Sequence, residues 1–129
     1  MLKGILDVED AKIAASSGVD ALVVSNHGGR QLDSTSSSIR ALPEIVDAVG
    51  DRLEVLFDGG IRSGQDVLKA LALGARGAMI GRAYAYGLGA LGERGVTRAL
   101  EIIRAELDVS MALCGVKDVK DVGRAILRG

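Results

Sequence analysis

The sequence is short of the residues that build disulfides and metal centres. It contains one cysteine, Cys114, one histidine, His27, and no tryptophan. A single cysteine excludes a disulfide or a cysteine-based zinc site within the chain, and no metal site is expected. Such sparing use of cysteine is typical of a reducing, cytoplasmic setting. We expect Cys114 itself to be a small buried residue near the end of a helix.

The chain also lacks a charge excess and a long apolar run. Its 16 Lys and Arg residues nearly balance 17 Asp and Glu residues, for a net charge of −1. A general attraction to nucleic acid or to an anionic membrane is therefore not expected, and no apolar run is long enough to span a bilayer. Met1-Leu2-Lys3 leads directly into a folded pattern, so we expect no secretory leader. Charged residues with a function must act locally, at a site.

Proline is scarce as well, with Pro43 alone, whereas glycine occurs 18 times. Apolar runs at residues 2–6, 21–25, 53–57 and 77–80 alternate with helical patterns, which predicts parallel strands joined by helices. We expect helices at residues 8–17, capped by Asp7, at 39–49 with Pro43 in or near the first turn, at 67–73 after a capping box formed by Ser63 and Asp66, and at 83–91 and 96–113. We expect Met111 in the core. For Tyr84 and Tyr86, packing on the outer layer is favoured, with a position beside a bound ligand as the alternative.

These four strand–helix units form one expected domain over residues 1–129. A complete (β/α)₈ TIM barrel needs eight such units and roughly 250 residues. Four units are half of such a barrel, although they could also form a small open sheet of the doubly wound type.

Three polar clusters follow the predicted strands, and ligands bind at this edge of parallel sheets. They are Ser25–Asp33, Asp58–Gly64 and Gly81-Arg82. Glycine lets backbone N–H groups approach an anion closely. Arg62 and Arg82 could each grip phosphate oxygens through the planar fork of a guanidinium group. The second and third clusters therefore predict a phosphate site, with a tight strand–helix turn as the simpler alternative.

The first cluster carries the candidate acid–base chemistry. His27 can move a proton near neutral pH, and Arg30 could bind a carboxylate through two hydrogen bonds. Together they would suit the deprotonation of a small hydroxy acid. The alternative is a solvent-exposed loop histidine beside a surface arginine.

The run Ser25-Asn26-His27-Gly28-Gly29-Arg30-Gln31-Leu32-Asp33 resembles the signature of the FMN-dependent α-hydroxy-acid dehydrogenases and oxidases. The resemblance extends from Lys3-Gly4-Ile5 to Gly81-Arg82 and implies the C-terminal half of a (β/α)₈ TIM barrel. It implies oxidation of a small L-2-hydroxy acid, such as lactate or glycolate, to the 2-oxo acid. His27 would take the hydroxyl proton, and Arg30 would hold the substrate carboxylate.

The same resemblance implies a binding site for FMN. Lys3 would lie near flavin N1 and the C2 carbonyl, where a positive charge favours the reduced ring. Ser25 would hydrogen-bond the flavin, and Asp58 would bind the ribityl chain. The FMN phosphate would be held by Gly59, Gly60, Arg62, Gly81 and Arg82.

In this family the N-terminal barrel half supplies a second substrate arginine, a tyrosine pair and the aspartate that orients the histidine. We therefore expect the isolated chain to turn over weakly or not at all, and to self-associate or to bind a missing N-terminal half. The alternative from another class is a non-catalytic FMN- or phosphate-binding half-barrel or scaffold. A fragment of an inosine-monophosphate dehydrogenase is disfavoured, because Cys114 lies in a late helix rather than in a catalytic loop.

Overall fold

A computed structural model describes residues 1–127 and contains one parallel sheet of four strands in the order β1-β2-β3-β4. The strands are β1 (Leu2–Ile5), β2 (Ala21–Val24), β3 (Glu54–Asp58) and β4 (Gly77–Met79). The α-helices are α1 (Val8–Ser16), α2 (Ser38–Val49), α3 (Gly64–Ala72), α4 (Arg82–Leu91) and α5 (Glu93–Leu113). Three short 3₁₀ helices are η1 (His27–Gly29), η2 (Val119–Asp121) and η3 (Arg124–Ile126). The predicted alternation of strands and helices is confirmed.

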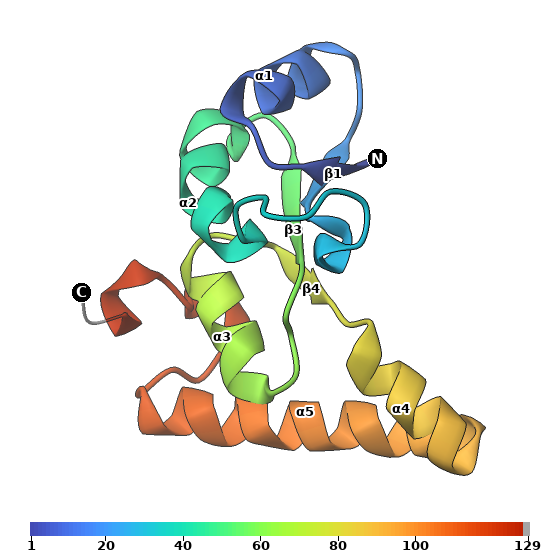
Figure 1. Ribbon diagram of the computed structural model, residues 1–129. Coiled ribbons are helices and arrows are strands. Elements are labelled where there is room, and N and C mark those ends of the chain that lie inside the picture. Colours follow the sequence, from blue (N-terminus) through green and yellow to red (C-terminus); the bar gives the residue numbers. More distant parts are fainter. Residues whose placement is uncertain (128–129) are drawn as a thin grey trace.

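Helices α1, α2 and α3 lie along one side of the sheet, and α4 and α5 form an antiparallel pair beyond β4 (Figure 1). Consecutive residues of a strand face opposite sides of a sheet. Val24 and Phe57 therefore face the helices, where both are fully or almost fully buried in the main core. The other face carries Lys3 next to Val23, and Asp58 next to Met79. The helical side thus holds the core, and the opposite side holds polar groups at the strand ends.

Local sequence signals fix several element boundaries. The Asp7 carboxylate accepts hydrogen bonds from the backbone N–H groups of Glu9 and Asp10, which caps α1 as predicted. Ser63 and Asp66 form the predicted capping box. Helix α3 nevertheless begins at Gly64, three residues before the predicted start, because the capping box itself lies within its first turn.

Three side chains test the other expectations of packing. Met111 is buried as predicted. The prediction of a buried Cys114 is wrong: this residue is exposed at the C-terminal cap of α5, where the helix ends. Pro43 lies in the second turn of α2, just past the expected first turn.

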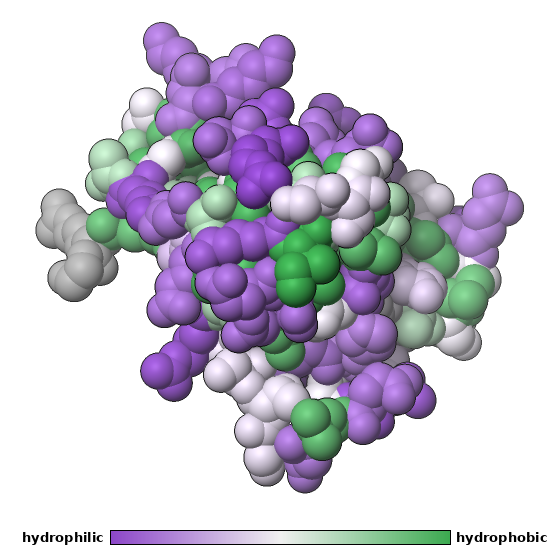
Figure 2. Space-filling model, turned by 90° about the horizontal axis from the view of Figure 1, so that it is seen from above, coloured by the Kyte–Doolittle hydropathy of each residue, from purple (hydrophilic) through white to green (hydrophobic). Residues whose placement is uncertain are grey.

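The surface is mostly hydrophilic on the face seen from above, with hydrophobic residues grouped near its middle (Figure 2). Larger exposed apolar side chains occur on α4 and α5, among them Leu91 and Leu113. No helix within residues 1–127 is long and apolar enough to cross a membrane. Over the same residues, no group of three or more His, Cys, Asp or Glu side chains is placed to hold a metal ion.

Candidate functional site

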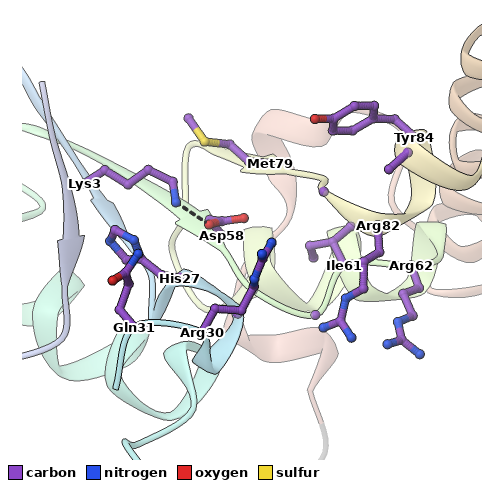
Figure 3. Close-up of a pocket in the computed structure, with 15 residues that line it drawn as sticks. Lys3, His27, Arg30, Gln31, Asp58, Ile61, Arg62, Met79, Arg82 and Tyr84 are labelled. Carbon is purple, nitrogen blue, oxygen red and sulfur yellow. Dashed lines mark ion pairs between the residues drawn. The ribbon is translucent and has the colours of Figure 1, made fainter. Parts of the chain in front are cut away.

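A cavity of about 620 Å³ opens at the carboxyl ends of the strands. Its walls come from β1, the loop after β2, the loop after β3, and the start of α4 (Figure 3). All three polar clusters of the sequence contribute to it. The predicted site residues that line it are Lys3, His27, Arg30, Asp58, Gly59, Gly60, Arg62, Gly81 and Arg82.

Ser25 lies beneath this cavity and connects three of its elements. The side chain is fully buried. Its hydroxyl donates to Asp58 Oδ2 at 2.7 Å and accepts from Lys3 Nζ at 3.1 Å and from the His27 backbone N–H at 3.1 Å. A serine hydroxyl has one hydrogen to donate and two lone pairs, so these contacts use its full capacity. Ser25 is not part of the cavity wall, and its hydrogen bond to a flavin stays a prediction.

Lys3 and Asp58 form an ion pair across the sheet, with Nζ 2.6 Å from Oδ2 (Figure 3). Partial burial alone would raise the pKa of Asp58, but the hydrogen bonds from Lys3 and Ser25 and the positive charge of Lys3 outweigh it and lower this pKa below its ordinary value. The aspartate is therefore ionised at neutral pH. Within the described part of the chain no donor binds its second oxygen, Oδ1, which is left as an acceptor at the cavity.

The loop after β2 presents His27 and Arg30 from a strained backbone. His27 has a φ of 56°, in the left-handed region that residues with a side chain rarely adopt. The Ser25 hydroxyl holds its N–H, and the Asn26 side chain accepts from Gly28 N at 3.0 Å. Arg30 ends the 3₁₀ turn and extends toward Asp58 in the close-up (Figure 3). This turn places an imidazole and a guanidinium on one wall.

The other end of the cavity contains two further arginines, and the two nearby helix N-termini differ. The N-terminus of α3 is satisfied by its capping box and by Glu106, whose carboxylate accepts from Gly64 N at 2.8 Å. The N-terminus of α4, at Gly81, is capped by no side chain of residues 1–127. Arg62 and Arg82 extend in the same direction beside it (Figure 3). A helix N-terminus with two guanidinium groups suits a phosphate dianion.

Sequence reasoning missed several cavity residues. Gln31, Ile61 and Met79 also line the cavity. Tyr84 lies on the first turn of α4 and faces the cavity (Figure 3), which agrees with the alternative position beside a ligand and not with the favoured packing on the outer layer. Its position two residues after Arg82 was the available signal, since a side chain in a first helical turn lies close to the strand ends.

Comparison with known proteins agrees with this geometry. The family model for FMN-dependent dehydrogenases matches residues 1–129. The chain is 64% identical over 127 residues to an L-lactate dehydrogenase of Caulobacter vibrioides, covering 98% of this chain and 33% of that protein. It is 55% identical over 125 residues to the pre-mycofactocin synthase of Mycobacterium tuberculosis, covering 97% of this chain and 32% of that protein.

Solved structures give the same result. A mandelate oxidase variant with a monooxide FMN adduct superposes with a TM-score of 0.91 at 50% identity, over 94% of this chain and 39% of that one. Mandelate oxidase with benzoyl-formic acid also superposes at 0.91 and 50% identity, over 94% of this chain and 36% of that chain. The chain spans about one third of the length of the curated relatives. Because the family model covers its whole length, the chain belongs to the FMN-dependent dehydrogenase family.

Proposed function

We propose that this chain carries the catalytic base, one substrate arginine and the FMN phosphate site of an oxidoreductase that converts a small L-2-hydroxy acid into the 2-oxo acid. One observation carries the proposal: a single cavity joins His27 and Arg30 at one end to Arg62 and Arg82 at the other. Similar relatives include L-lactate dehydrogenases and a mandelate oxidase. The substrates in these names, lactate and mandelate, are both 2-hydroxy acids, and we propose a substrate of that class for this chain.

The residues present fit FMN. Two guanidinium groups and the uncapped N-terminus of α4 offer positive charge and donors to a phosphate. Gly60 and Gly81 line the same region, and a methyl group placed on either would meet no atom within 4 Å. Backbone can therefore approach a ligand there. The free Oδ1 of Asp58 suits the hydroxyl groups of the ribityl chain, and Lys3 supplies a positive charge for the ring.

The acid–base work belongs to the His27 end. Arg30 would bind the substrate carboxylate through two hydrogen bonds and so fix the 2-hydroxyl group relative to the imidazole. The His27 imidazole would accept the hydroxyl proton. Bound FMN supplies the acceptor for the two electrons and the hydrogen that leave the α-carbon. The Lys3 ammonium would stabilise the negative charge that this transfer brings to the site.

We further propose that the four-stranded sheet is the C-terminal half of a (β/α)₈ barrel, with residues 1–129 as one segment of it. Among the described residues, β1 and β4 are the edges of the sheet and each pairs on one side only. Open strand edges favour pairing with further strands. The missing strands would come from an N-terminal segment or from a second copy. Light scattering across protein concentrations should show association of the isolated chain; a monomer at high concentration would refute it.

Absorbance titration of the purified chain with FMN tests the proposed function. We expect saturable binding with a perturbed flavin band, and weaker binding by Arg82→Ala, on the order of tenfold or more, because a charged hydrogen bond to phosphate is lost. Arg104→Ala is the matched control, since Arg104 is exposed on α5 and lies outside the cavity wall.

The outcomes separate the two classes of function. Binding that Arg82→Ala weakens and Arg104→Ala does not supports the phosphate site. If FMN binds but a 2-hydroxy acid never reduces it after the complementary half is added, the chain is a non-catalytic flavin-binding module. Absence of FMN binding by both the isolated and the complemented chain would refute the proposal. Oxidation by the isolated chain at the rates of complete relatives would contradict the expected need for the other half.

A further inference from the structure

Strand β1 contains an irregularity at Gly4. Lys3 pairs with Val23 and Ile5 pairs with Val24, so one residue more lies between the pairs on β1 than on β2. Gly4 is this extra residue and has a φ of 100°, as expected for the residue of a β-bulge that takes a left-handed conformation. The bulge alters which side of the sheet each β1 residue faces.

In a regular strand, residues two apart face the same side. Val23 and Val24 are consecutive and face opposite sides, so their β1 partners Lys3 and Ile5 also face opposite sides. Ile5 packs against the main core, whereas Lys3 reaches Asp58 at the cavity. Without the bulge, Lys3 and Ile5 would share a face, and one of them would lie on the wrong side of the sheet.

The same glycine lies against the His27 ring. A methyl group on Gly4 would be 2.5 Å from His27 Nε2 and 3.2 Å from Cδ2. Carbon atoms in folded proteins do not approach a ring nitrogen so closely, so any side chain at position 4 would displace the imidazole. The His27 ring therefore occupies space that a side chain at position 4 would fill.

We propose that Gly4 is a positioning residue of the site, which turns Lys3 toward Asp58 through its bulge and leaves the space that the His27 imidazole occupies. The inference deepens the proposed function, because it supplies the orientation of the proposed base. Two residues position His27: the Ser25 hydroxyl accepts a hydrogen bond from its backbone N–H, and Gly4, which has no side chain, leaves room for its ring.

A double-mutant cycle on thermal unfolding tests the steric part without cofactor or substrate. Alanine at a φ of 100° is strained in any background, whereas the clash exists only while the His27 ring is present. We expect Gly4→Ala to lower Tm more in the native background than in the His27→Ala background, but only by about 1–2 °C, because the exposed imidazole can turn aside at little cost. Equal decreases in the two backgrounds would overturn the proposal.

The second readout follows the ring itself, and it is simple because His27 is the only histidine. In the native chain, NMR should detect a nuclear Overhauser effect between the Gly4 α-protons and the imidazole protons. Gly4→Ala should shift the imidazole resonances. Gly18→Ala is the matched control: Gly18 also has a positive φ, 77°, but nothing lies within 4 Å of its methyl position. It should lower Tm and leave the imidazole resonances unmoved.

The outcomes are distinct from those of the FMN titration. Absence of the native Overhauser contact, or imidazole resonances unaffected by Gly4→Ala, would overturn the inference even if FMN binds. A confirmed contact together with failed FMN binding would remove the proposed function and keep the steric relation. If the Gly4→Ala variant does not fold but the double variant Gly4→Ala, His27→Ala does, the result supports the proposal. If neither variant folds, the Overhauser contact in the native chain decides.

Discussion

Removing the Ser25 hydroxyl should weaken the whole site, because this group is the shared partner of three elements. Ser25→Ala deletes the hydrogen bonds to Asp58 Oδ2, from Lys3 Nζ and from the His27 N–H. Lys3 and Asp58 keep their direct contact at 2.6 Å, and the exposed His27 loop can recover water for its N–H. The main loss is therefore the buried, charge-assisted bond to the carboxylate.

Hydrogen bonds to charged groups contribute about 1.5–3 kcal/mol to stability, so we take about 2 kcal/mol for this one. Unfolding entropy of about 2.1 cal/mol/K per residue gives about 270 cal/mol/K for the chain of 129 residues. A loss of about 2 kcal/mol then lowers Tm by about 7 °C. Calorimetry or circular dichroism near pH 7 measures the shift.

Ser110→Ala is the matched control. Ser110 is also a buried serine, but its hydroxyl donates to the Glu106 carbonyl one helical turn away, a local bond that adds little to helix stability. We expect a change in Tm of less than about 3 °C there. Equal shifts for the two variants would show that Ser25 acts only as a small core residue, and the reasoning about its hydroxyl would be refuted.

Two further predictions concern pH and packing. Because the folded state lowers the pKa of Asp58, its ionised form adds stability above the unfolded pKa of about 3.9, and this stability is lost as the pH falls through the lower folded pKa. The Asp58→Asn variant should therefore lose less stability than the native chain when the pH is lowered from about 5, as measured by urea unfolding. Parallel stability profiles for the two proteins would contradict this. Gly64→Ala should destabilise the fold by about 1–3 kcal/mol, since its methyl group would overlap the backbone of Glu106 and Leu107 on α5. Gly89→Ala, where a methyl group on α4 meets nothing within 4 Å, should instead stabilise it by about 0.5–1 kcal/mol, and the same sign for both in thermal melts would refute the packing argument.

Most of the fold could be predicted from local pattern. The apolar runs Ala21–Val24 and Val55–Phe57 are uninterrupted, as expected for strands of a parallel sheet. The capping roles of Asp7 and Ser63 were predicted from their side chains, although α3 begins three residues before its predicted start. The exposure of Cys114 could not be predicted in this way, because it depends on how the C-terminal end of α5 packs in the folded chain.

The candidate site was only partly visible in the sequence. The motifs at the strand ends predicted that His27 and Arg82 belong to the site, and both line the cavity, since parallel strands bring their carboxyl ends to one edge. The links among Lys3, Ser25 and Asp58 join residues 22 and 33 positions apart, and no local pattern encodes such contacts. The role of Gly4 required the register of β1 against β2, which is a property of the paired strands.

The strain in the loop after β2 has a physical basis in its neighbours. A non-glycine residue at a φ of 56° persists only where other contacts compensate for it. Ser25 provides one such contact at the His27 N–H and is itself fixed by the Asp58 carboxylate, whose charge Lys3 stabilises. The backbone of the proposed base is therefore held by an ionised group on the neighbouring strand. Loss of the charge on Asp58 would weaken the contact that holds His27, so the charge state of the cavity and the position of its imidazole are linked through one buried hydroxyl group.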